Sequence, residues 1–424
     1  MQNTSSDSVR SRFLAPIAAA LNSIAQQRLC PAYSDAEHLA TGIGRVIASA
    51  QSGRDWVQSV QMTYDGDVSV GNFFDALRSA RRTACVAAVA QAVHRELDDV
   101  LSTAADPLAQ HPELDGFAVY ACDGHTHAAS AHAPLRQGEV CPVTHIFNLN
   151  LRSHSMGHLA QCAPARQKAE HEITTLKRLG GQTLRMGART GRKVLLVYDP
   201  AIVDYPQWYK WKQAAGVYIL TLEKANSALT TLAELFWDRH DPRNAGVLSD
   251  ELVGPANGVN MRRIRYQDPV IGTLYSFLTN ELTLPPGLLA FLYKLRWNIE
   301  KVFDQVKNKF GEQKAWATTT EAQCQQAAFI TLAHNLTLRL ERMLAAEEAI
   351  TDQKAQRKRA ARLAAEQARA KAAGRTFNAA VAACQRLTQR SLQFLRWLRY
   401  CLQHLTSWSV AVARLRPLMQ HYLT

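Results

Sequence analysis

The chain has 424 residues, 47% of them hydrophobic, which is enough for two or three domains with buried cores. Its formal net charge is +13 and its sequence pI is near 9.5. We therefore expect a polyanionic partner, because cations that neutralise phosphates release counterions.

The eight cysteines contain no C-x-x-C pair, which argues against a disulfide framework or a four-cysteine zinc site. There is no signal-peptide pattern and no apolar run of about 18 residues, so a cytoplasmic protein without membrane contact is the expectation.

Residues 1–112 are predicted to be mostly helical. One run, residues 72–82, begins with a plausible cap and ends in basic residues. Its three arginines, Arg78, Arg81 and Arg82, would lie on or near one helix face. This pattern is typical of a small helical DNA-binding module, and equally of a solvated helix end.

Residues 113–223 are predicted to form three strands, a helix, a strand, a helix and a strand. The expected elements, in chain order, are residues 117–122, 143–151, 158–162, 170–179, 193–198, 205–215 and 217–222. The strands are short apolar or alternating runs rich in strand-forming residues, and the helices end at glycines. This order is that of an RNase H-like core, an α/β fold.

Residues 224–284 break this alternation with several prolines and glycines. Two strand-like pieces, 261–266 and 273–279, predict a mostly β insertion. Residues 285–345 then supply a last helical part of the core.

Residues 346–424 are predicted to be a basic helical C-terminal region. Between Lys354 and Arg375 the only acid is Glu366, and alanine is frequent. High helix propensity with a thin apolar stripe predicts an exposed helix that contacts DNA or a partner subunit, or a solvated linker helix.

Two aspartates follow buried strands in the predicted core. Asp123 comes after 117–122, and Asp199 after 193–198. Carboxylates that leave neighbouring strands can meet at one sheet edge, where hard divalent cations find the oxygen ligands that they require. Asp115 is the rival of Asp123, and Asp204 that of Asp199. Taken singly, each aspartate is more typical of a strand-end cap or a turn.

A third acid lies in a helix-like run near residue 300. Tyr293, Arg296, Glu300 and Lys307 are spaced 3, 4 and 7 apart, so on one helix they fall within an arc of roughly 60°. An acid that binds a metal would then lie beside groups that hold a phosphate. The alternative is an ordinary surface ion pair between Arg296 and Glu300.

This run resembles a known motif. The spacing Y-(2)-R-(3)-E-(6)-K, with Arg-Trp-x-Ile-Glu-x-x-Phe inside it, is similar to the motif around the last acid of insertion-sequence transposases of the IS-four type. Those are bacterial DDE transposases with an RNase H-like core and a β insertion before the last acid. The resemblance implies that Asp123, Asp199 and Glu300 are the catalytic, metal-binding triad.

The resemblance also implies a cofactor, partners and a reaction. The cofactor would be Mg²⁺, for which Mn²⁺ can substitute. The partners would be double-stranded DNA, as inverted repeats and as target, and a second subunit in a homodimer on DNA. Tyr293, Arg296 and Lys307 would bind DNA phosphates. Some relatives hold a flipped base against a tryptophan of the insertion, and Trp237 lies in that region, although core packing is the commoner role of a tryptophan.

Histidines gather between residues 111 and 171. His154, His158 and Cys162 have helical zinc-ligand spacing, but this stretch is predicted as strands and turns, where that spacing does not bring side chains together. His125 and His127 could line the site beside Asp123, and exposed strand histidines are the simpler interpretation.

The sequence therefore favours a transposase that cuts DNA at transposon ends and joins the 3′-OH to target DNA. It would be a bacterial cytoplasmic protein, nucleoid-associated when bound to DNA. Two rivals are a related nuclease without strand transfer and a catalytically silent, domesticated DNA-binding protein.

Overall fold

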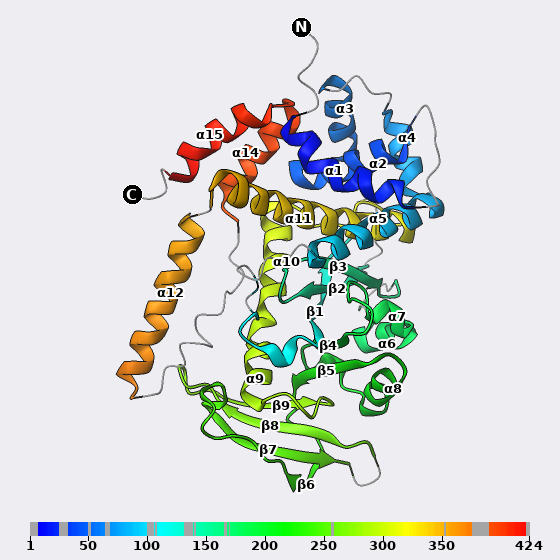
Figure 1. Cartoon of the computed structure of the whole chain (residues 1–424). Coiled ribbons are helices and arrows are strands. Elements are labelled where there is room, and N and C mark those ends of the chain that lie inside the picture. The colour runs from blue at the N-terminus through cyan, green and yellow to red at the C-terminus, as the bar shows by residue number, and fades with distance from the viewer. Residues whose placement is uncertain are drawn as a thin grey trace.

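A computed structural model of the chain is mixed α/β, with one large sheet between groups of helices (Figure 1). The structure describes residues 7–24, 33–49, 52–63, 68–99, 106, 108–130, 139, 141–164, 168, 170–255, 258–351, 353–374 and 390–420. Within these residues no helix is long and apolar enough to span a membrane. The described cysteines Cys85, Cys122, Cys141, Cys162, Cys324 and Cys401 form no disulfide.

The sheet has nine strands in the order β3-β2-β1-β4-β5-β9-β8-β7-β6. Their bounds are β1 Phe117–His127, β2 Val143–Asn150, β3 Met156–Gln161, β4 Lys193–Val197, β5 Val217–Leu222, β6 Thr230–Glu234, β7 Val247–Gly254, β8 Met261–Gln267 and β9 Leu274–Thr279. Strands β1, β4 and β5 are parallel to one another, and every other neighbouring pair is antiparallel. All five predicted core strands are present, and so are both predicted insertion strands.

The insertion continues the core sheet. Strand β9 pairs with β5, and β8, β7 and β6 extend the sheet outward from it. Strands β6 and β7 were not predicted, because all five residues of β6 are exposed and β7 mixes acids with apolar residues. The insertion is thus mostly β, as expected.

Two layers of helices cover the sheet, and the side-chain alternation of β1 assigns them. Ala118, Tyr120 and Cys122 pack in the cluster that includes α8, Tyr205–Ala215, and α6, Glu172–Arg178. A short helix, α7 Gly181–Leu184, also lies on this side. Phe117, Val119 and Ala121 belong to the larger cluster on the other face. That cluster includes α9 Pro286–Leu295, α10 Trp297–Lys309 and α11 Thr320–Glu348.

The N-terminal residues are helical, as predicted. Their helices are α1 Val9–Asn22, α2 Asp35–Ala48, α3 Gly53–Thr63, α4 Val70–Leu77 and α5 Ala80–Asp99. Several pack on the long helix α11, and one apolar cluster runs from them into the sheet. The run 72–82 forms the end of α4 and the start of α5, with Arg78 as the cap between them.

The arginines of that run have local partners. Arg81 donates two hydrogen bonds of 2.8 Å to Asp35. Arg82 is buried, donates to the Tyr33 carbonyl and stacks on the Tyr33 ring. Arg78 is exposed beside Asp75. The expected basic face is therefore reduced to Arg78, since Arg81 and Arg82 hold the helices together.

The C-terminal region is helical too, with α12 Gln353–Ala372, α14 Leu392–Gln403 and α15 Trp408–Gln420. Helices α14 and α15 return to the N-terminal helices, and Val9 donates its amide to the Thr406 carbonyl at 3.0 Å. Helix α12 stands apart from the sheet and from α10 (Figure 1).

Candidate active site

Strand register brings two of the predicted acids level with each other. The parallel pair β1–β4 matches Ala121 with Val197, where β4 ends. Asp123 and Asp199 each lie two residues beyond that match, Asp123 within β1 and Asp199 in the turn that follows β4. Residue parity also directs both side chains to one face, since Ala121 and Val197 belong to the cluster that contains α9 and α10. The sequence had suggested that Asp123 follows the end of a strand. Strand β1 continues to His127, however, so Asp123 lies within the strand.

The third acid lies on α10, but the helix is not continuous. The run that was predicted as one helix divides at Arg296, which caps both α9 and α10. Arg296 keeps helical dihedral angles, and the hydrogen bonds around it span three residues, from Arg296 to Tyr293 and from Ile299 to Arg296. Tyr293 is therefore on α9, whereas Glu300 and Lys307 are on α10.

Arg296 connects the two helices to the sheet. Its Nη1 donates to Asp123 Oδ2 at 3.0 Å and lies 3.5 Å from Glu300 Oε1. The Arg296 side chain is only 7% exposed, and Asp123 is also buried, whereas Glu300 is 41% exposed. The Arg296 guanidinium also lies 5.8 Å from the centre of the Tyr293 ring. The i,i+4 pair, for which an ordinary surface ion pair was the alternative interpretation, is thus half of a bridge between a buried and an open carboxylate.

These carboxylates repel one another. Burial, hydrogen bonding to Glu300 and repulsion by Glu300 raise the pKa of Asp123 to about 8, against the opposing charge of Arg296. Burial lowers the pKa of Arg296, but Tyr293 and the acids Asp123, Glu300 and Asp199 outweigh it and raise the pKa. The site therefore holds more negative charge than one arginine compensates, as expected of a place that receives a cation.

A fourth carboxylate, which the sequence analysis did not identify, lies at this site. Burial raises the pKa of Glu172. A hydrogen bond with Tyr198 opposes this rise, and the charge of Asp199 adds to it. Its carboxylate lies against Gly124, where an added Cβ would come within 2.1 Å of Glu172 Oε1. Gly124 thus provides the space that Glu172 occupies, one residue along β1 from Asp123 and, by strand alternation, on the side of the sheet that α6 covers. The Asp-Gly pair was the available signal, but it did not indicate what fills that space.

The rival aspartates have structural roles. Asp204 caps α8 by accepting from the Gln207 amide at 3.0 Å, and pairs with Lys177. Asp115 precedes β1, at the opposite end of the strand from Asp123, and lies 3.6 Å from Arg152. Asp199 also caps a turn, since it accepts from the Ala201 amide at 2.9 Å. Its backbone carbonyl accepts from Thr221, which fixes the start of that turn to β5.

The histidines beside Asp123 are not exposed strand residues, so that interpretation was wrong. His127 is 3% exposed, and the His125 ring lies 4.9 Å from the Phe303 ring of α10. Burial lowers the pKa of His125 to about 4 and that of His127 to about 3. Strand β1 runs beneath α10 here, which covers the residues after Asp123. These neutral imidazoles support the position of α10 over the strand.

The zinc-like spacing does not form a metal site. His154 lies in the turn before β3, and His158 lies in β3, where it pairs with His145 at 3.0 Å. Among the described residues no group of three histidine, cysteine, aspartate or glutamate side chains is arranged to hold a metal ion. That finding includes the three predicted acids. Arg296 contacts both Asp123 and Glu300. The donor set still fits a hard divalent cation, since all its members are carboxylates and burial, together with the neighbouring Glu300, raises the pKa of Asp123.

The tryptophans differ in burial. Trp208 and Trp211 of α8 are buried in the core. Trp237 follows β6, is partly buried, and lines an open hollow of about 560 Å³ at the outer end of the sheet. The adjacent Phe236 is 97% exposed and lines the same hollow. Two aromatic rings are therefore accessible on the insertion.

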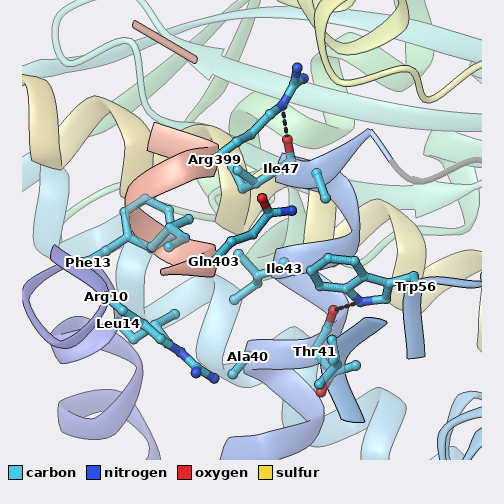
Figure 2. Close-up of a pocket in the computed structure, with 14 residues that line it drawn as sticks. Arg10, Phe13, Leu14, Ala40, Thr41, Ile43, Ile47, Trp56, Arg399 and Gln403 are labelled. Carbon is cyan, nitrogen blue, oxygen red and sulfur yellow. Dashed lines mark hydrogen bonds between the residues drawn. The ribbon is translucent and has the colours of Figure 1, made fainter. Parts of the chain in front are cut away.

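An apolar cavity of about 40 Å³ lies elsewhere, among α1, α2, α3 and α14. Figure 2 shows its lining, in which Trp56 Nε1 donates to the Thr41 carbonyl at 2.9 Å and Arg399 donates to the Ile47 carbonyl. The Arg399 guanidinium also donates to the Lys309 carbonyl at the end of α10. This cavity contains no acid, and the polar groups that surround it already hold the N-terminal and C-terminal helices together.

Comparison with known proteins locates a family signal over part of the chain. The model of the family described as Transposase DDE domain matches residues 189–336. No curated protein matches the chain. The matched segment contains Asp199, Trp237, Tyr293, Arg296, Glu300 and Lys307. It begins after Asp123. The match supports a DDE transposase family, which implies DNA as substrate, an enzyme of DNA cleavage or transposition and, in general, divalent metal ions.

Proposed function

We propose that this protein is a DDE transposase that binds the inverted repeats of a transposable element, cleaves the DNA there and joins the freed ends to target DNA. The observation that carries the proposal is the bridge from Asp123 through Arg296 to Glu300, with Asp199 just after the end of the neighbouring strand β4. The order β3-β2-β1-β4-β5 supports an RNase H-like core. The family match from residue 189 to 336 supports the reaction class.

In this proposal Asp123, Asp199 and Glu300 provide oxygen ligands for Mg²⁺, or Mn²⁺ in its place. Bound metal ions activate the attacking oxygen and stabilise the leaving oxygen of an in-line displacement at phosphorus. Asp123 must lose its proton before it acts as a ligand, and its raised pKa makes this step dependent on pH. In the absence of a cation, Arg296 supplies one positive charge between the two acids and compensates them only in part.

The other residues position DNA. Arg296 can donate two parallel hydrogen bonds to a phosphate, and the exposed Lys307 supplies a positive charge farther along α10. Tyr293 is buried beside Arg296 and orients that guanidinium. Trp237 lies in an open hollow with the exposed Phe236, which suits stacking on a displaced base. Joining two ends at once requires two subunits, so we infer a homodimer on DNA.

The test is cleavage of a plasmid that carries the inverted repeats flanking this gene, with Mg²⁺ or with EDTA. Glu300→Gln keeps the shape of the side chain but removes the charge, so it is expected to bind DNA and not to cut it. Asp304→Asn is the matched control, because Asp304 is an exposed acid one turn farther along α10. The control is expected to cut like the wild type.

Each other outcome contradicts a specific part of the proposal. Cleavage by Glu300→Gln would exclude Glu300 from the chemistry. Binding of the repeats without cutting by the wild type would indicate a silent DNA-binding protein. Cutting without joining to target DNA would indicate a nuclease, and no binding at all would contradict the family assignment.

A further inference from the structure

We infer that helix α12 is a DNA-binding arm that lays one face along the phosphates of a double helix outside the active site. The inference rests on the proposed function, because it takes DNA as the partner. It adds a second binding surface with named residues. The predicted catalytic acids and the residues around them are not part of this α12 surface.

The burial pattern of α12 defines two faces. Arg359, Leu363, Glu366 and Ala370 are less exposed than their neighbours and are spaced 4, 3 and 4 apart, so they form one stripe toward the rest of the molecule. Helix α12 contacts α15. The remaining surface of the helix faces solvent.

A row of cations lies on an adjacent face of the helix, about 90° around from this stripe and next to Glu366. Lys358, Arg362 and Arg369 are all exposed, and spacings of 4 and 7 place them within an arc of about 40°. Exposed alanines lie on and beside this row at positions 361, 365, 368 and 372. No acid lies in the row. A partner can therefore come close to the helix backbone while three long cationic side chains reach it.

The dimensions of the row suit duplex DNA. At 1.5 Å per residue it extends about 16 Å, with steps of about 6 Å and 10 Å. One DNA strand carries a phosphate about every 3.4 Å along the axis, so a row of this length spans about five nucleotides. The major groove, about 12 Å wide, admits an α-helix. With no aromatic residue and no amide side chain in the row, the contact would be to phosphates and would not select a sequence.

The charge around α12 continues toward the acids. Buried His154 has its pKa lowered to about 3, first by burial and then by the charges of Arg342, Lys301, Arg390 and Arg359. Lys301 follows Glu300 on α10, and Arg359 belongs to α12. Lys301 of α10 and Arg359 of α12 therefore lie within electrostatic range of the same imidazole.

The experiment measures how binding of a short labelled duplex of arbitrary sequence depends on salt. The series is Arg362→Ala, Arg362→Ala with Arg369→Ala, and the triple variant with Lys358→Ala. Alanine is the best helix former, so α12 is expected to keep its structure, which circular dichroism checks. The slope of log K against log salt is expected to become shallower by about 0.9 for each cation removed.

The matched control is Lys210→Ala with Lys224→Ala. Both lysines are exposed, one on α8 and the other after β5, and their removal changes the net charge as much as the double variant does. Helix α8 lies across the molecule from α12 in Figure 1. The control is expected to keep the wild-type slope.

Equal slopes for the series and the control would overturn the inference. So would an unchanged slope with weaker self-association in sedimentation, because the arm would then contact a second copy of the chain. Cleavage that depends on Glu300 while these slopes stay unchanged would leave the proposed function standing and remove only the arm. Failure of the wild type to bind any duplex would contradict both.

Discussion

Arg296 Nη1 and Asp123 Oδ2 lie 3.0 Å apart across 173 residues of sequence, and both side chains are buried. This contact joins the sheet to the junction of α9 and α10. Since Arg296 is also 3.5 Å from Glu300, the position of one guanidinium determines the separation of two carboxylates. The acids are thus held by a third side chain that is itself suited to binding phosphate.

Arg296→Gln is expected to destabilise the protein more at pH 9 than at pH 6. Without Arg296 the pKa of Asp123 rises further, so at pH 6 Asp123 remains protonated and needs no counter-charge. At pH 9 the wild-type carboxylate is ionised and paired with Arg296. In the variant it either keeps a proton that the unfolded chain has lost or ionises without a partner, and removing one partner of a buried pair costs about 3–5 kcal/mol. Urea unfolding at both pH values measures the difference. An equal loss at both would show that Arg296 does not compensate Asp123.

Asp123→Asn is expected to stabilise the protein at high pH. The pKa of Asp123 is about 8 in the folded protein and near 3.8 when unfolded, so between these values the folded state holds the extra proton. Stability contributed by Asp123 is therefore lost as pH rises through this window. Asparagine does not ionise, so the variant should melt above the wild type at pH 9 and near it at pH 4. Asp115→Asn, at an exposed position, is the control.

Gly124→Ala is expected to reduce DNA cleavage with only a small loss of stability. The new Cβ would lie 2.1 Å from Glu172 Oε1, at the end of a flexible side chain that can move aside. The displaced carboxylate would then alter the charge around Asp123. Combining Gly124→Ala with Glu172→Ala removes the clash, so thermal unfolding of the four proteins should show a coupling between the two positions. Additive effects would mean that Glu172 does not occupy the space above Gly124.

Acid is expected to unfold the protein steeply below about pH 6. Nine histidines have their pKa lowered, in each case chiefly by burial: His38, His94, His111, His125, His127, His145, His154, His158 and His334. The unfolded chain therefore binds more protons below pH 6.5, and stability falls as pH falls. Asp123 has the opposite effect on the pH dependence of stability, because the folded state holds its extra proton, but it contributes only one proton.

Unfolding free energies at pH 7, 6 and 5 measure this slope. His158→Gln should make it shallower by up to about 1.4 kcal/mol per pH unit, the value of one proton. His240→Gln, at an exposed position, should leave it unchanged. A slope that His158→Gln does not change would mean that this imidazole titrates normally in the folded protein.

The sequence was most informative where a pattern is local. The strand 193–198 is a short apolar run, and the helix 205–215 ends at a glycine; both were found close to their observed bounds. The start of β1 was found as well, but the strand continues to His127, five residues beyond the predicted end. Glu300 was predicted from its spacing to Tyr293 and Arg296, and the structure places it 3.5 Å from Arg296. By contrast, β6 was not predicted. Its residues are all exposed, so they show no hydrophobic alternation, and its pairing with β7 cannot be recognised from the residues of β6 alone.

Contacts between distant segments could not be predicted. Glu172 belongs to a helix that the sequence indicated only as periodic, and its approach to Gly124 depends on how that helix packs on the sheet. His125 and His127 alternate like solvent-facing strand residues, but α10 crosses the strand and buries them. The break at Arg296 likewise follows from where α9 and α10 pack, since the run contains no proline or glycine there.

The direct pairing of β9 with β5 has a mechanical consequence. The sheet passes from the strand beside Asp199 to the strands around Trp237 without a linker or a hinge, so the insertion cannot swing toward the acids. The distance between the aromatic hollow and the carboxylates is therefore set by the number of strands between β4 and β6. A DNA segment that reaches both must itself bend or open to match that length.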